Sequence, residues 1–230
     1  MFAPLHGYGN LLLQGFVMTI GVALASMVVA TLLGLVGVWG KLARSRFARN
    51  VTDAYTTVVR GVPELVMLLL VYYGVPTLIQ DIAKGLGTPL VLNLNPIIAG
   101  VLTLGFIYGA FSTEVFRSAY QAVPRGQLEA ARAFGMSRWL VVRRVLLPQM
   151  WRFALPGLGN VWIVLVKATA LISVIELNEL MRIAEVGAQA TRLPFTFYFA
   201  AAMLYLTLTT VSMGVQSRLE AWANRGVRRA

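Results

Sequence analysis

Several ionisable side chains lie inside or at the edge of long apolar stretches of this sequence, and they are its first candidates for chemistry. Arg60 and Glu64 flank Pro63, Glu114 follows a long uncharged run, and Lys167 lies within another apolar run. A charge inside a bilayer is costly, so such a residue needs a partner, water or a polar pathway and is a functional candidate by default. We predict that Glu64, Glu114 and Lys167 line a polar pathway.

Each of these charges also has a purely structural interpretation. Arg60 can snorkel to the membrane surface and pair with Glu64 one helical turn further on. Glu114 can be an interfacial carboxylate beside Arg117. Either carboxylate can be the partner of Lys167, and the sequence does not choose between them.

Other kinds of reactive site find little support. A hydrolase using Lys167 and Ser173 is disfavoured, because six residues on a helix place the two side chains about 240° apart. The chain has no cysteine and one histidine, His6, so we expect no metal site. The Gly-Lys pair at 40–41 precedes Leu42, where a phosphate-binding loop requires Ser or Thr. We therefore predict no catalytic residue and no cofactor bound by this chain.

The composition predicts that helices within a membrane position these residues. Of the 230 residues, 58% are apolar and only 13% are charged, whereas soluble domains carry about 25% charged residues. Residues 1–40, 85–113 and 193–217 contain no charge at all. Apolar runs of this length indicate membrane spans, so we predict an all-α polytopic membrane protein. The expected spans are residues 11–39, 53–80, 96–119, 151–177 and 195–216.

The distribution of basic residues predicts the orientation of these spans. The net charge is +11, and 15 of the 20 Lys and Arg residues fall in residues 41–49, 117–152 and 218–229. Each block adjoins an apolar run, which is the pattern of cytoplasmic loops rather than of a nucleic-acid site. We predict that the N-terminus lies outside and the C-terminus inside. The cytoplasmic parts are then residues 120–148 and a basic tail at 220–230.

Prolines predict interruptions of the helices. Pro63 lacks a backbone donor and its ring clashes one turn back, so the second span should be broken or kinked there. Pro156 should interrupt the start of the fourth span. Pro124 and Pro148 should flank a rigid cytoplasmic helix.

The segment 127–148 is amphipathic and rich in arginine. With residues 127–138 as a helix, one side carries small residues and an aromatic anchor, which favours docking of a partner. That side consists of Ala130, Ala131, Phe134 and Gly135. The alternative is an interfacial helix that lies on the membrane without a partner.

The spacing within this segment resembles a known motif. Glu129-Ala130-Ala131, three residues, Gly135, nine residues, Val145, one residue and Leu147-Pro148 is similar to the EAA motif of binding-protein-dependent ABC transporter permeases. Further stretches resemble the polar amino-acid permeases of that family, although Glu64 stands where Asp is expected. These stretches are residues 60–66, 105–110, 113–117, 155–160 and 167–171.

The resemblance implies a fold and a function. The fold is a type I ABC transporter transmembrane domain over residues 11–219. The function is that of a permease subunit of an ATP-driven importer for polar amino acids, with basic amino acids as the expected substrates, in the bacterial inner membrane. A pair of separate ATPase subunits would use ATP and dock at Glu129–Gly135. A periplasmic binding protein would deliver substrate, and a second, homologous permease subunit would complete a heterodimer. The alternative is a single-component channel. Such a channel would not need the spacing of the EAA motif.

Overall fold

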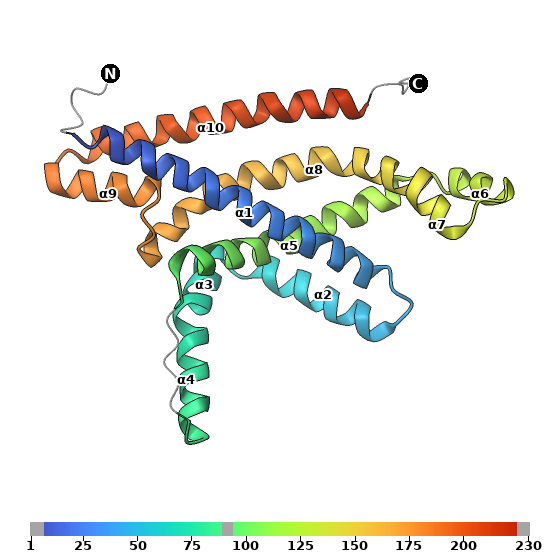
Figure 1. Cartoon of the computed structure of the whole chain (residues 1–230), viewed down its shortest axis with the longest axis horizontal. Coiled ribbons are helices and arrows are strands. Elements are labelled where there is room, and N and C mark those ends of the chain that lie inside the picture. Colours follow the sequence, from blue (N-terminus) through green and yellow to red (C-terminus); the bar gives the residue numbers. More distant parts are fainter. Residues whose placement is uncertain (1–6, 89–93, 225–230) are drawn as a thin grey trace.

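The computed structural model describes residues 7–88 and 94–224, and every regular element within these ranges is a helix (Figure 1). Five helical stretches are long and apolar enough to cross a membrane. The prediction of an all-α polytopic protein with about five such helices is therefore confirmed. The stretches are Gly9–Lys41, Glu64–Gly85, Pro96–Ala122, Arg138–Ile175 and Pro194–Ala223.

Helices α1 (Gly9–Lys41) and α5 (Pro96–Ala122) form the centre of the bundle. Glycines allow them to approach closely, as small residues do between membrane helices. A Cβ added to Gly105 would lie 2.5 Å from the Val29 side chain, and one added to Gly109 would lie 2.8 Å from Leu33. Substituting either glycine would push the two helices apart.

The fourth apolar stretch is one long, continuous run of helix. It comprises α7 (Arg138–Val141), a π-helical turn, α8 (Leu147–Ala168) and a 3-10 segment, Thr169–Ile175. The core cluster joins α1, α5 and this run through residues such as Val22, Ile107 and Leu165. The prediction that Pro156 interrupts the run was wrong, because Pro156 lies inside α8.

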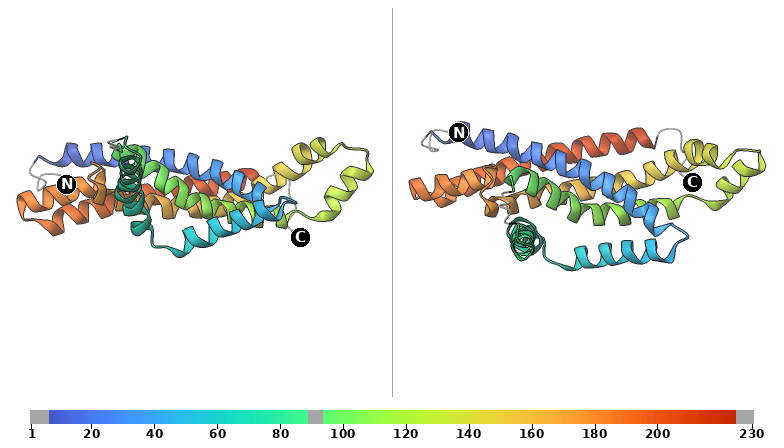
Figure 2. Two further views of the ribbon diagram at one scale, coloured as in Figure 1. Left: turned by 90° about the horizontal axis from the view of Figure 1, so that it is seen from below. Right: turned by 60° about the horizontal axis from the view of Figure 1, so that its bottom comes forward.

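The second expected span needs the largest correction. Residues 53–80 do not form one kinked helix: α2 (Arg46–Gly61) ends before Pro63, and α3 (Glu64–Leu69) begins after it. Val62 is extended, as expected for a residue that precedes proline. Helix α2 lies beside α1 and α5, whereas α4 (Val75–Gly85) leaves the bundle crosswise (Figures 1 and 2). The break predicted at Pro63 is confirmed.

Two further prolines follow π-helical turns. The turns are Leu70–Gly74 and Val142–Leu146, and Pro76 and Pro148 each come two residues after them. A proline inside an α-helix lacks a donor and clashes with the carbonyl four residues back. The residue after each turn instead donates to the carbonyl five residues back: Val75 to Leu70, and Leu147 to Val142. Pro148 therefore lies within a continuous helix, contrary to the prediction that it ends one.

The remaining elements close the two ends of the bundle. Helix α9 (Leu180–Thr191) packs on α1 and on α10 (Pro194–Ala223) near the start of α1. At the opposite end lie the α1–α2 loop, the α6–α7 region and the last turns of α10 (Figure 1). The basic segments within the described residues thus gather at one end of the molecule.

Candidate functional site

The segment 125–141 forms two short helices joined by a tight turn rather than one helix. Helix α6 (Arg125–Ala133) ends at Phe134, and Gly135 follows with φ of +78°. The Gly135 N–H donates to the Arg132 carbonyl at 2.9 Å, and the Met136 N–H to the Ala131 carbonyl at 3.2 Å. These are the two bonds of a Schellman motif, which requires a left-handed residue at this position. The expected helix over 127–138 is corrected accordingly.

The four residues of the predicted docking side do not all lie on one exposed face. Phe134 is 86% exposed and Ala130 is also exposed, but Ala131 is only 6% exposed and faces the interior. We call Glu129, Ala130, Phe134 and Gly135 the hairpin tip; all four are exposed. The hairpin tip thus combines an exposed aromatic ring, small residues and a carboxylate at one protruding turn.

A polar groove of about 480 Å³ lies beside the hairpin tip. Its walls include Tyr120 and Gln121 of α5, and Arg125, Glu129 and Arg132 of α6. Glu129 makes no ion pair within the described residues. The groove thus offers charged groups of both signs next to the exposed ring.

An ionic cluster links α1, α2 and α5 at the same end of the bundle. The Lys41 Nζ lies 2.8 Å from the Asp53 Oδ1 and 2.6 Å from the Glu114 Oε1. The Arg117 Nε donates to the Glu114 Oε2 at 2.7 Å. The Lys41 side chain is 10% exposed, so these pairs are screened less than surface pairs are. The structural interpretation of Glu114, beside Arg117, is the one that the geometry supports.

Glu64 lies at the break between α2 and α3, and it does not pair with Arg60. Its Oε1 accepts a hydrogen bond from the Tyr108 hydroxyl at 2.8 Å, while the Arg60 guanidinium lies 5.3 Å from the centre of the Phe111 ring. The break in the helix removes the one-turn spacing on which the predicted Arg60–Glu64 pair depended. A half-buried carboxylate is thereby held at the point where α3 turns away from the bundle.

Lys167 has neither of its predicted partners. It is exposed on α8, and the described residues give it no ion pair. Glu114 is engaged by Lys41 and Arg117, and Glu64 by Tyr108. The three candidate pathway residues therefore do not form one cluster within this chain.

A buried carboxylate, Glu179, connects three helices at the end of the bundle opposite the hairpin tip. The sequence alone did not single it out. Glu179 is 1% exposed and caps α9 by accepting the Arg182 N–H at 2.8 Å. The hydroxyls of Thr19 in α1 and Tyr205 in α10 each lie 3.2 Å from its Oε2. Burial raises the pKa of Glu179, and these hydrogen bonds partly oppose that effect.

The sequence alone does not predict the contacts that these residues make. Lys41 and Asp53 were assigned to a loop and to the start of a span, and only the return of α2 along α1 brings them together. Tyr108 lies in the run 105–110, but nothing in its spacing from Glu64 predicts a contact. Glu179 directly precedes α9, but Glu is not among the residues that usually cap a helix N-terminus, so the sequence did not signal this role.

Comparison with known proteins agrees with the resemblance of the motif. The chain belongs to the family described as binding-protein-dependent transport system inner membrane component, whose model matches residues 26–225. It is thus a membrane component of a transport system by family.

Particular relatives match over almost their whole length. The chain is 42% identical over 226 residues to the histidine/lysine/arginine/ornithine transport system permease protein HisQ of Escherichia coli (strain K12), with 98% of this chain and 99% of the relative covered. It is 48% identical over 223 residues to the nopaline transport system permease protein NocQ of Agrobacterium fabrum (strain C58), with 96% and 94% covered.

A solved structure confirms the type I ABC transmembrane fold. The structure described as an amino acid ABC transporter with histidines matches with a TM-score of 0.82 and 32% identity. The match covers 96% of this chain and 98% of that chain.

Proposed function

We propose that this chain is the membrane-spanning permease subunit of an ATP-driven importer for basic amino acids or related opines in a bacterial inner membrane. The relatives are permeases of histidine, lysine, arginine, ornithine and nopaline transport systems, which supports a cationic amino-acid class of substrate. The N-terminus is outside and the C-terminus inside in this proposal. The gathering of the basic segments at one end of the bundle supports that orientation.

The hairpin tip carries the proposal. It projects from the basic end of the bundle with Phe134 86% exposed, and a separate ATPase subunit provides the surface that would cover it. ATP is used by that partner in this proposal, and we assign no catalytic role to the described residues of this chain. Motion of the ATPase pair would reach the spans through α7, which continues into α8 without a break.

Replacing Phe134 with Ala tests this coupling. Because the ring is almost fully exposed, folding of the chain should be unaffected, whereas loss of an aromatic anchor costs an interface about 2 kcal/mol or more. We expect weaker co-purification of the ATPase and a matching fall in ATP-driven uptake by proteoliposomes.

Phe195→Ala is the matched control, since Phe195 is 79% exposed at the far end of the bundle. Equal ATPase retention in the two variants would contradict the assignment of the hairpin tip. Uptake by the chain alone, without ATP, would favour the single-component channel instead.

Glu64 is the pathway residue that we propose to test first. Its half-buried carboxylate is not neutralised by an ion pair within the described residues, whereas Glu114 already binds two cations. Glu64→Gln should reduce uptake of arginine roughly tenfold and uptake of a neutral amino acid much less. The reason is that the proposed hydrogen bond between the Glu64 carboxylate and the positively charged substrate loses its ionic character.

Tyr108→Phe is the control, because it removes the hydroxyl donor at 2.8 Å and keeps the carboxylate. It should affect cationic and neutral substrates alike. An equal loss for both substrate classes in Glu64→Gln would show that the residue acts in packing. Lys167 and Glu114 remain candidates for the same assay.

The proposed assembly contains a second, homologous permease subunit and a periplasmic binding protein. Helix α4 supports the second subunit: the span that contains it has only 11% of its most apolar window buried, and it stands clear of the bundle. Four of its exposed side chains are apolar: Leu78, Ile79, Ile82 and Val75. A neighbouring chain would bury them.

A further inference from the structure

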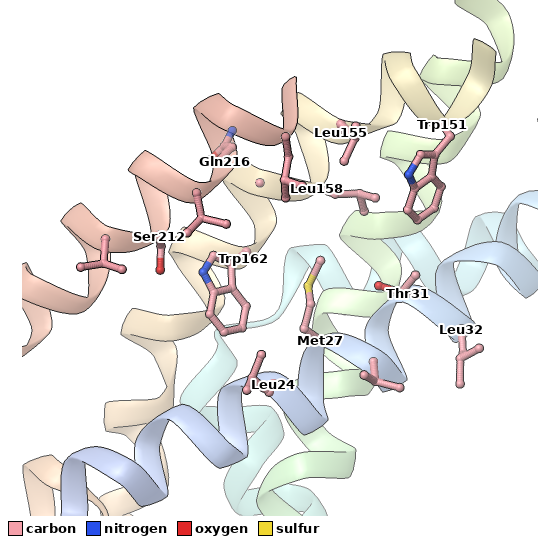
Figure 3. A pocket seen from close by; sticks show the side chains of 15 residues that line it. Leu24, Met27, Thr31, Leu32, Trp151, Leu155, Leu158, Trp162, Ser212 and Gln216 are labelled. Atoms are coloured by element: carbon pink, nitrogen blue, oxygen red, sulfur yellow. The ribbon is translucent and has the colours of Figure 1, made fainter. Parts of the chain in front are cut away.

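An apolar groove of about 590 Å³ runs between α1, α8 and α10 (Figure 3). Leu24 and Met27 of α1 face Leu158 and Trp162 of α8 across it, and Ser212 lies on the α10 side. The volume falls within the range of roughly 300–1,000 Å³ that is usual for ligand pockets. None of the candidate residues discussed above lines this groove.

The groove lies along the second half of α10. The buried residues of this helix, Phe197 and Ala201, lie near its start, where α9 packs on it, and Tyr205 and Leu208 pack on the core further along. The Gln216 side chain fills the space above Gly159, and its Nε2 lies 3.4 Å from the Pro156 carbonyl. Between Leu208 and Gln216, the side chains of Val211, Ser212 and Val215 line the groove.

A second groove of about 530 Å³ adjoins the first, and the positively charged side chain of Arg152 lines it. The two share Trp151, and the second also contains Arg152 and Trp222. The Arg152 guanidinium lies 4.9 Å from the centre of the Phe153 ring, and its Nε is buried with no hydrogen-bond partner among the described residues. Arg152 makes no ion pair among the described residues, and the planar fork of arginine matches a phosphate.

We propose that the two grooves together bind one anionic phospholipid. An acyl chain occupies the apolar groove, and the phosphate accepts hydrogen bonds from Arg152. Trp151 and Trp222 lie at the level of the headgroup, as aromatic residues do at membrane interfaces. Basic pockets between membrane helices are known to take such headgroups.

The chemistry favours this occupant over a protein segment. A helix of a neighbouring chain would fill the apolar groove but would leave the charge of the Arg152 guanidinium without an anionic partner. Inorganic phosphate would satisfy Arg152 but would leave exposed the apolar side chains that line the first groove, such as Leu24 at 54% and Val215 at 51%. A phospholipid satisfies both with one molecule.

Mass spectrometry of bound lipid tests the site. The full chain, purified in detergent with the subunits that accompany it, is analysed for phosphatidylglycerol and phosphatidylethanolamine retained per chain. We expect selective retention of phosphatidylglycerol, a roughly tenfold loss in Arg152→Gln and a smaller loss in Arg152→Lys, because a charge-assisted hydrogen bond is removed or weakened. Arg218→Gln, at an exposed position on α10, should retain lipid as the unchanged chain does.

Three further measurements decide between occupants. Val28→Trp, which fills the apolar groove and leaves Arg152 in place, should lose the lipid. Stabilisation against heat by inorganic phosphate alone, equal to that by phosphatidylglycerol, would overturn the proposal. The chain has no cysteine, so a single cysteine at Val215 can be cross-linked in membranes. Efficient cross-linking to another subunit, with lipid retention unchanged in Arg152→Gln, would assign the groove to a protein partner and also overturn it.

Discussion

At the scale of single residues, backbone conformation decides more than side-chain bulk at the hairpin tip. Gly135 has no atom within 4 Å of where its Cβ would lie, so space is not the constraint. Its φ of +78° is the constraint, because L-residues other than Asn and Asp rarely adopt this region. The glycine of the motif is therefore explained by the turn that ends α6.

This explanation predicts the order of substitutions at position 135. Gly135→Ala should destabilise the turn by about 1 kcal/mol, and Gly135→Val by more, whereas Gly135→Asn should be tolerated best. Protease sensitivity of the α6–α7 turn measures the effect without any transport assay. If Asn were as disruptive as Val, the positive φ would not be the reason for glycine at this position.

At the scale of elements, each π-helical turn sets the rotation of the helix on either side of it. The extra residue in the turn Val142–Leu146 rotates α7 by about 100° relative to an uninterrupted α-helix. The direction in which α7, and with it the hairpin tip, leaves α8 thus depends on a hydrogen-bond register that Pro148 imposes. π-turns of this kind are frequent at functional sites.

Replacing Pro148 with Ala should release that register. The variant regains an N–H donor and loses a ring clash, so thermal stability should be unchanged or higher. Rotation of the hairpin should nevertheless uncouple transport, with ATP hydrolysis retained and uptake reduced severalfold. Pro156→Ala, in a part of α8 without a π-turn, is the control and should retain coupling. Normal uptake in Pro148→Ala would show that the register is not required.

The sequence predicted helices well and their directions poorly. Long apolar runs identified α1, α5, α8 and α10, because hydropathy reports directly on residence in a bilayer. The break at Pro63 was predicted from local sterics. The course of α2 along α1, the crosswise path of α4 and the cluster around Lys41 depend on contacts between distant segments, and no local pattern encodes them.

At the scale of the whole molecule, one buried carboxylate connects three helices that meet at the end far from the hairpin tip. Glu179 contacts α1 through Thr19 and α10 through Tyr205 while capping α9. Its raised pKa means that the folded protein holds the proton to higher pH than the unfolded chain does. The stabilising contribution is therefore complete below the unfolded pKa of about 4.5 and is lost as pH rises through the folded value.

This sign predicts the pH dependence of stability. As pH rises from 4.5 through the folded pKa, the free energy of unfolding should fall because of this group, at no more than about 1.4 kcal/mol for each pH unit. Glu179→Gln should flatten that slope in thermal unfolding measured in detergent. Glu185→Gln, on the same helix but about a third exposed, should leave it unchanged. A slope that survives Glu179→Gln would assign the dependence to another group.

The crosswise helix α4 has a consequence for how the protein matures. Local order comes from buried contacts, and α4 has one buried residue, Pro76. In the assembly that we propose, a neighbouring permease subunit packs on the apolar side chains of this helix. The helix would then gain its local order when the two subunits meet, so that folding of α4 and assembly of the complex would be a single event.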